Sequence, residues 1–237
     1  MIRHPEKSLH RRSHEVEQGV ATIRYIVNSC GPADTATFAV EVNQCTSTLN
    51  LTAFIQGYYD STTNLMSSAL MNSSVAGASS LQADTITVEI HDGATGAIIG
   101  SPVQTMLMTN GTCTAVFPAL SGRHYIVLKH RNAMELWSAD SVLMGPTVSY
   151  NFSTSASQAY GDNQAYIGDG LYGMWSGDVN GDGIIEGSDY LKMETDVLQI
   201  LFGYYNTDLT GDGIVEGSDY LLMEQNVLRI IFVARPY

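Results

Sequence analysis

Alternation of apolar and polar residues dominates the first two thirds of the chain. In TATFAVEV (35–42) the two kinds of side chain take turns, which is the period of a strand with one buried face. Turn-forming stretches such as HDGATG and TNG separate the segments of this kind. Short strands at this spacing are typical of two packed sheets, so we expect a mainly β chain with an Ig-like antiparallel β-sandwich. The expected strands span residues 20–27, 35–42, 49–59, 84–92, 97–107, 112–117, 124–131 and 148–152.

The pattern changes to helical spacing after residue 178. Apolar side chains recur there every three or four positions, which predicts two amphipathic helices packed against each other. The two stripes are copies, since residues 178–202 and 208–232 share 17 identities in 25 aligned positions. Such an internal duplication suits a pseudo-two-fold pair. The stripe residues are Tyr190, Met193, Val197 and Leu201 in the first copy and Tyr220, Met223, Val227 and Ile231 in the second.

These patterns divide the chain into five parts. A polar tail at residues 1–19 shows no periodicity, and a segment with strand character follows at 20–46. The β-sandwich domain is expected at 47–155. A connector rich in glycine and tyrosine at 156–176 leads to a small helical domain at 177–237.

Composition and charge narrow the functions that the chain can have. Hydrophobic residues make up 44% of the 237 residues, enough for a packed core, and charged residues only 15%. The formal net charge is −13 and no basic stripe is interleaved with aromatic residues, so nucleic acid is not an expected partner. No apolar run approaches the roughly 18 residues of a membrane span, so no transmembrane segment is expected. The polar N-terminus lacks the apolar stretch of a signal peptide, which leaves open whether a signal was removed.

Two acidic loops precede the predicted helices. They read DVNGDGIIEGSD (178–189) and DLTGDGIVEGSD (208–219). A twelve-residue calcium loop carries oxygen ligands at positions 1, 3, 5, 7, 9 and 12, and a glycine at position 6 where the chain turns sharply. Both loops follow this pattern, so we expect two Ca²⁺ sites. The expected ligands are Asp178, Asn180, Asp182, the Ile184 carbonyl, Glu186 and Asp189 in the first loop, and Asp208, Thr210, Asp212, the Ile214 carbonyl, Glu216 and Asp219 in the second.

An alternative is that both loops are acidic turns that cap helices, since Asp and Ser before an apolar stripe also fit an N-cap. Two loops in register, each with the full set of positions, favour calcium, and Mg²⁺ resists such all-protein cages. We expect Ile184 and Ile214 to pair through short backbone hydrogen bonds. Without ions the clustered acids should repel one another, so folding and binding are coupled. Aspartate at position 12 has a shorter arm than the usual glutamate, which predicts a weaker site suited to a calcium-rich exterior.

The duplicated loop and helix, DVNGDG…YLKMETDVL and DLTGDG…YLLMEQNVL, resemble the dockerin family over about residues 176–235. The resemblance implies calcium binding and docking to a cohesin, a β-sandwich partner. In dockerins, loop positions 10 and 11 and the following helix contact that partner. Those loop positions are Gly187–Ser188 and Gly217–Ser218 here, where the glycine departs from the usual pair of small hydroxyl residues. Lys192 and Leu222 occupy matching helix positions.

The upstream segments LNLTAFIQGYYD, DTITVEIHD and HYIVLKHRNAMELWSA resemble C-terminal regions of secreted Bacteroidota surface proteins. In those proteins a β-sandwich precedes a dockerin-like pair, which implies an extracellular or cell-surface location. The chain also contains the Asp-Ser/Thr-apolar tripeptides that this phylum O-glycosylates. The corresponding hydroxyl residues are Thr35, Ser61, Thr85 and Ser141.

The chain has three cysteines, Cys30, Cys45 and Cys113. Cys30 and Cys45 flank a Gly-Pro turn and a short strand, so a local disulfide between them is one expectation. The other is that all three are small buried hydrophobic residues. The sequence leaves both open.

No pairing of a nucleophile with a base accompanies the histidines, and the acids gather in the calcium loops, so an enzyme is not expected. The expected function is that of a non-catalytic, calcium-binding structural subunit. It would self-assemble into an extracellular fibre or surface layer by adding its N-terminal strand, 20–27, to a neighbour's sheet. One alternative is a dockerin-type adaptor that docks to a cohesin-like partner. The other is a carbohydrate-binding or adhesion module that binds polysaccharide through aromatic side chains such as Trp137.

Overall fold

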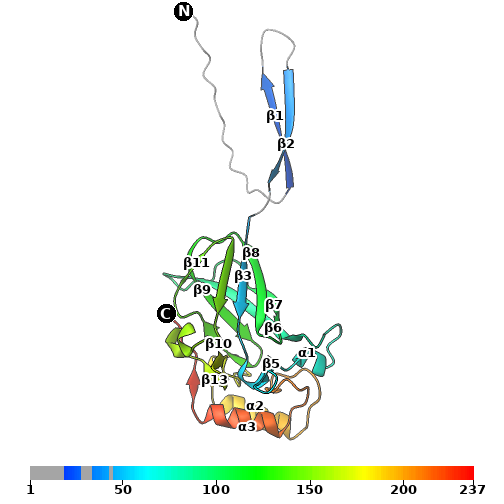
Figure 1. Cartoon of the computed structure of the whole chain (residues 1–237), viewed down its shortest axis with the longest axis vertical. Coiled ribbons are helices and arrows are strands. Elements are labelled where there is room, and N and C mark those ends of the chain that lie inside the picture. The colour runs from blue at the N-terminus through cyan, green and yellow to red at the C-terminus, as the bar shows by residue number, and fades with distance from the viewer. Residues whose placement is uncertain (1–18, 28–33, 43–44) are drawn as a thin grey trace, which may run out of the picture. The chain divides into compact units, whose positions relative to one another are not determined.

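The computed structural model describes residues 19–27, 34–42 and 45–237 (Figure 1). The chain forms two compact units, Met1–Cys45 and Thr46–Tyr237. The expected sandwich and helical domains therefore lie in the same unit. No helix of the described residues is long and apolar enough to span a membrane.

The first unit contains a single hairpin among its described residues. Strand β1 (Gly19–Val27) pairs with β2 (Asp34–Val42) in antiparallel register, from Gly19 opposite Val42 to Val27 opposite Asp34. The segment that we expected to join a neighbour's sheet thus has a partner in its own chain along its whole length. A contact with a neighbour would have to use the other edge of the hairpin.

Two sheets form the sandwich of the second unit. The larger sheet has the order β10-β9-β6-β7, with β11 also paired to β9, and the smaller has the order β12-β3-β8. Strand β8 shows why these segments are strands, because Cys113, Ala115 and Phe117 are buried while the residues between them are exposed. The larger sheet consists of β6 (Gln82–Asp92), β7 (Val103–Met108), β9 (Gly122–His130), β10 (Ala133–Trp137) and β11 (Val142–Met144). The smaller consists of β3 (Thr46–Thr52), β8 (Thr112–Pro118) and β12 (Thr147–Asn151).

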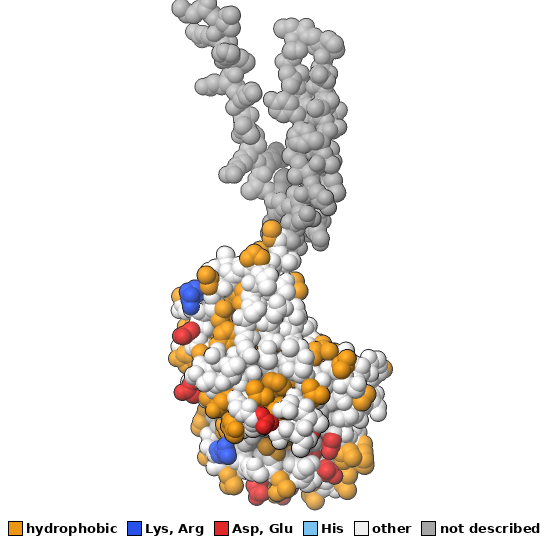
Figure 2. Space-filling view, in the orientation of Figure 1, with side chains coloured by type: hydrophobic (Ala, Val, Ile, Leu, Met, Phe, Trp, Pro, Cys, Tyr) orange, Lys and Arg blue, Asp and Glu red, His pale blue; other side chains and the backbone are white. Residues whose placement is uncertain are grey.

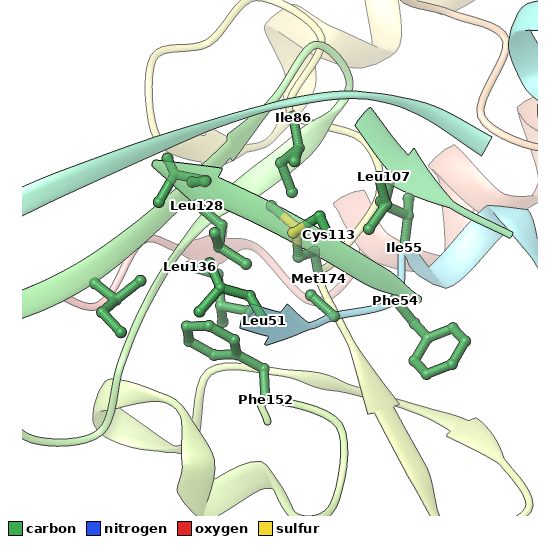
Figure 3. Close-up of a cluster of buried hydrophobic side chains, with 14 of the residues drawn as sticks. Leu51, Phe54, Ile55, Ile86, Leu107, Cys113, Leu128, Leu136, Phe152 and Met174 are labelled. Carbon is green, nitrogen blue, oxygen red and sulfur yellow. The ribbon is translucent and has the colours of Figure 1, made fainter. Parts of the chain in front are cut away.

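The core lies between the two sheets. Figure 3 shows side chains from both sheets pointing toward one another, with Ile86 and Leu128 from the larger sheet facing Leu51 and Cys113 from the smaller. Phe152, which follows β12, fills the space beside Leu51 and is fully buried. The predicted mainly β sandwich is confirmed as a fold class. One pairing differs from the antiparallel expectation, because β12 runs parallel to β3.

Short elements connect the sandwich to the helices. The segment 49–59 was predicted as one strand. In the structure the strand ends at Thr52, and a 3-10 turn follows. These connecting elements are η1 (Gln56–Tyr58), β4 (Tyr59–Asp60), β5 (Leu65–Met66), α1 (Ala69–Asn72), η2 (Ala156–Gln158), η3 (Tyr160–Asp162), β13 (Ala165–Gly168) and β14 (Leu171–Gly173). They are followed by β15 (Ile184–Ile185), α2 (Gly187–Val197), α3 (Gly217–Val227) and β16 (Ile231–Phe232).

Candidate metal centre

Helices α2 and α3 lie side by side at one end of the second unit (Figure 1). Met193 and Met223, in the middle of the two predicted stripes, are fully buried, and the tyrosine at the start of each stripe is half-buried. The hydroxyls of Tyr190 and Tyr220 are hydrogen-bonded to each other. The predicted packing of one stripe on the other is therefore confirmed, although Leu201 and Ile231 lie beyond the helix ends.

The glycines at position 6 of both acidic loops adopt the left-handed backbone of the sharp turn that the sequence pattern predicts. At position 6, Gly183 has a φ of 86° and Gly213 a φ of 88°. Position 4 repeats this, with φ values of 74° at Gly181 and 70° at Gly211. A residue with a Cβ would be strained at these points, which explains why the duplication keeps glycine there.

The aspartate at position 1 holds each turn from inside. Asp178 accepts hydrogen bonds from the backbone amides of Gly181 at 2.8 Å and Gly183 at 3.1 Å. Asp208 does the same in the second loop, with Gly211 at 2.7 Å and Gly213 at 3.1 Å. The two loops therefore share one backbone arrangement.

The aspartate at position 12 closes each loop. Asp189 accepts hydrogen bonds from the amides of Val179 at 2.9 Å, Asn180 at 3.2 Å and Glu186 at 3.2 Å. Asp219 accepts them from Thr210 and Glu216, both at 2.9 Å. Glu186 immediately precedes α2, and the hydrogen bond from its amide to Asp189 is typical of a helix N-terminus. The capping alternative therefore describes part of the role of Asp189.

Capping does not account for the charges at these positions. Burial and the neighbouring charge of Asp189 raise the pKa of Asp178 to about 6, and burial and Asp219 do the same for Asp208. Burial also raises the pKa of Asp189 and of Asp219. Each loop thus holds two buried acids that destabilise each other's ionised form. A bound cation would remove this repulsion, so the donor set fits Ca²⁺.

The remaining predicted ligands lie at the rim of each loop. Asp182 and Asp212 are exposed and accept a hydrogen bond from the amide two residues on, at 3.0 Å from Ile184 and 2.9 Å from Ile214. Asn180 is exposed and donates to Asp182 at 3.0 Å, and Thr210 is half-buried. Glu186 is half-buried and Glu216 exposed. Across the described residues, no three Asp, Glu, His or Cys side chains converge into a ready-made metal site. An ion would therefore have to draw the rim carboxylates inward.

The expected pairing of Ile184 with Ile214 is wrong. Ile184 pairs with Phe232 in the β15–β16 ribbon, and Ile214 forms a bridge with Phe202. Phe202 and Phe232 follow α2 and α3, so the segment leaving each helix reaches the loop that precedes the other helix. The physical reason is that the segment after each helix has backbone N–H and C=O groups that need partners, and it runs alongside a loop of the other copy. The resulting backbone hydrogen bonds join the two copies.

The helix ends strengthen this interlock. Near the end of α2, Asp196 accepts a hydrogen bond from Thr207 at 2.7 Å, just before the second loop. At the matching position of α3, Asn226 donates to the carbonyl of Ser176 at 2.7 Å, just before the first loop. Each helix end is therefore hydrogen-bonded to the segment that leads into the other copy's loop.

Apolar side chains that the helical stripes did not include are exposed on both copies. Leu198 and Leu228 are 81% and 80% exposed, and Phe202 and Phe232 are 70% and 59% exposed. Thirty residues separate the members of each pair, so the duplication itself was the signal that could have identified them. We call these the α2 set (Leu191, Leu198, Ile200, Phe202) and the α3 set (Leu221, Leu228, Ile230, Phe232).

Ile200 and Ile230 adopt a backbone that isoleucine normally avoids. Their φ angles are 48° and 49°, in the left-handed region where a β-branched residue is strained. Each lies just past a helix end, where glycine is the usual residue. Both are more than half exposed, so burial does not compensate for the strain.

The other predicted sites lie elsewhere. Cys45 is exposed and Cys113 is buried. Cys30 lies outside the described residues, so the bond to Cys45 stays a prediction. Among the glycosylation candidates, Ser61 is exposed and Ser141 half-buried, while Thr35 lies in β2. Thr85 stands between the buried Asp84 and Ile86 in the middle of β6, which leaves that tripeptide poorly accessible. For sugar stacking, Trp137 is only 4% exposed.

No protein-family model and no curated protein matches this chain. The solved structures that resemble it include a chain of a type II cohesin–X–dockerin complex from Acetivibrio cellulolyticus, an N-terminal interface mutant. The two chains are 18% identical at a TM-score of 0.40, and the alignment covers 76% of this chain and 94% of that chain. A likeness at this TM-score assigns neither a fold nor a partner to the chain.

Proposed function

We propose that the chain is a non-catalytic, extracellular docking protein whose duplicated calcium module binds a cohesin-like β-sandwich partner. The observation that carries this proposal is the pair of exposed apolar sets on α2 and α3. Exposed apolar groups that recur at matched positions are typical of protein-binding surfaces. Figure 2 shows hydrophobic patches beside acidic side chains at the end of the unit where Figure 1 draws the helices.

The strained isoleucines support a binding role for these sets. Natural chains retain backbone strain mainly where function requires it, and the same unusual residue stands at both exits. The residues along each outer face fit a docking surface as well. Leu191 in α2 and Leu198, the C-cap residue just past its end, lie seven positions apart, which places them on one face. Leu221 and Leu228 repeat this arrangement at α3.

Calcium would serve this function by fixing the helices. Asp178, Asp189, Asp208 and Asp219 would hold the ions together with the rim oxygens. The ions would supply the positive charge that lets these buried acids stay ionised side by side. Weak sites of this type fill at the millimolar calcium found outside cells, which supports an extracellular location.

A binding experiment tests the proposal. A panel of cohesin-type β-sandwich modules would be titrated with the full chain in millimolar calcium and again in chelator. We expect calcium-dependent binding to at least one module. The variant Leu198→Ala/Leu228→Ala should weaken binding by about tenfold or more, because exposed apolar anchors carry much of an interface's energy.

Leu143 provides the matched control, since it is 65% exposed on strand β11, away from the helices. Leu143→Ala should bind like the unaltered chain. Binding that survives in chelator would contradict the docking role. So would a Leu143→Ala chain whose binding is weakened as much as that of the Leu198→Ala/Leu228→Ala chain.

A second candidate function is self-assembly into an extracellular fibre. The observation that favours it is the two-stranded β1–β2 sheet, because a sheet of two strands is marginally stable alone and gains from further strands. Electron microscopy of the full chain and of a chain lacking residues 1–45 tests this candidate. Identical assemblies from both, or none from either, would rule it out.

A further inference from the structure

The two calcium loops are near copies, but they stand in different surroundings. In the second loop Asp208 is fully buried, Gly211 is buried and Thr210 is half-buried. In the first loop the matching Asn180 and Gly181 are exposed. Since the aspartates at position 1 make the same hydrogen bonds to the backbone of both loops, we attribute the difference in burial to the sandwich.

Two asparagines of the sandwich unit hold the backbone of the second loop. Asn132, fully buried in the turn between β9 and β10, donates from its side chain to the carbonyl of Asp208 at 2.7 Å. Asn72, at the end of α1, donates to the carbonyl of Gly211 at 2.7 Å. These bonds fix loop positions 1 and 4 from two directions.

Close backbone packing reinforces this hold. A Cβ added at Gly57 would lie 2.1 Å from the carbonyl oxygen of Leu209. A Cβ added at Gly213 would lie 2.5 Å from the carbonyl oxygen of Asn72. Glycine is therefore required at both positions for the second loop to pack against the sandwich.

An ion network anchors the turn that carries Asn132. Arg131 contacts Asp84 at 3.0 Å and donates to the Tyr58 hydroxyl at 2.6 Å. Its guanidinium also donates to the carbonyl of Tyr205 and lies 4.0 Å from the centre of the Tyr204 ring. The chain leading into the second loop is thus bound to the sandwich before Asp208 is reached.

The first loop lacks equivalent contacts. Between residues 45 and 237, no sandwich side chain hydrogen-bonds to the backbone of 178–189. The side chain that does so from outside the loop is Asn206, which belongs to the helical module and donates to the carbonyl of Val179 at 3.3 Å.

We propose that Asn132 and Asn72 pre-form the second loop, so that it binds calcium more tightly than the first. The inference rests on the calcium binding proposed above. A loop that is already ordered loses less conformational freedom when an ion binds, and this saving appears as affinity. Asn132 and Asn72 are positioning residues, because they bind the loop backbone and not the ion.

A calcium titration followed by NMR tests this, with the metal alone as the probe. The amides of Gly183 and Gly213 report on the two loops separately. In the full chain the Gly213 signal should respond at lower calcium than the Gly183 signal. Asn72→Ala should weaken the Gly213 step about fivefold or more and leave the Gly183 step in place, as expected for the loss of one ordering hydrogen bond.

Asn206→Ala is the matched control and should weaken the Gly183 step alone. Asn72 and Asn206 are both exposed, so these variants should fold even where Asn132→Ala does not. Equal affinities in the unaltered chain, or an Asn72→Ala chain in which both steps weaken alike, would overturn the inference and leave calcium binding intact. A chain in which neither glycine responds to calcium would overturn the proposed function as well.

Discussion

At the scale of single residues, Ile200 and Ile230 combine a strained backbone with an exposed apolar side chain. Their left-handed backbone would suit glycine, yet both copies of the module keep an exposed isoleucine there. A strained position whose side chain is more than half exposed fits the docking role proposed above.

Replacing both isoleucines by glycine should therefore stabilise the fold and weaken docking. We expect Ile200→Gly/Ile230→Gly to raise the free energy of unfolding by about 1 kcal/mol per site, because glycine pays no steric penalty at positive φ. Urea denaturation in calcium measures this. Ile98→Gly is the control, since Ile98 is 50% exposed without a positive φ, and that change should destabilise the chain. A double variant less stable than the unaltered chain would contradict the account.

The acids at loop positions 1 and 12 predict an unusual response to pH when calcium is absent. Burial and mutual repulsion raise the pKa of Asp178 and of Asp208 from 3.8 to about 6. A raised pKa in the folded chain contributes stability at low pH, and this contribution is lost as pH rises through about 6. In chelator we expect a higher melting temperature at about pH 5 than at about pH 7.5.

With millimolar calcium the order should reverse, because the ion requires ionised carboxylates. Thermal melts followed by circular dichroism make both comparisons. Asp178→Asn/Asp208→Asn should reduce the difference in chelator. A chain that is stabilised in chelator as pH rises from 5 to 7.5 would show that these acids are not held in the arrangement described.

At the scale of elements, the turn between β9 and β10 joins the sandwich to the helical module. Burial alone would raise the pKa of Asp84, but His130 and Arg131 outweigh it and hold that pKa well below the ordinary value. Tyr204, from the segment before the second loop, also donates to Asp84. One buried carboxylate thus connects strand β6, the β9–β10 turn and the helical module.

Breaking this connection should be costly. We expect Arg131→Met to destabilise the chain by about 3–5 kcal/mol, because it leaves the Asp84 charge buried without its partner. Because the pKa of Asp84 is depressed in the folded chain, its carboxylate stabilises the fold above the ordinary aspartate pKa. This stabilisation is lost as the pH falls below that value. Urea denaturation should therefore show that the free energy of unfolding falls between about pH 4 and pH 2. In the Asp84→Asn chain this fall should be smaller. An Arg131→Met chain as stable as the original would contradict the role of the turn.

Local patterns in the sequence predicted some of these elements and missed others. The Met193 and Met223 stripes follow from helical spacing, and the sharp turns at Gly183 and Gly213 follow from the order of acids and glycines within twelve residues. The pairing of Ile184 with Phe232 could not be predicted from local patterns, because it joins the loop before α2 to the segment after α3. Asn132 was also missed, since a lone asparagine in a turn carries no local signal of the carbonyl it will bind. The parallel pairing of β12 with β3 is non-local in the same way.

At the scale of the molecule, residues 46–237 should unfold as one body. Met134 of strand β10 packs in the same buried cluster as Met193 and Met223, so the sandwich and the helices share a core. We expect the near-ultraviolet circular dichroism of the tyrosines and tryptophans and the far-ultraviolet signal of the helices to change at the same temperature, as in a two-state transition. Two separate transitions within this unit would show that the helical module folds independently.

The stoichiometry of calcium binding in solution tests whether the duplicated loops hold ions. Isothermal titration calorimetry of the calcium-free full chain should give two ions per chain, and Asp178→Asn/Asp208→Asn should bind neither tightly. The same titration with magnesium is the control for non-specific attraction to a chain of net charge −13. The account predicts two calcium ions, with binding lost in the double variant. A chain that binds no calcium, or a double variant that binds as much as the original, would contradict it.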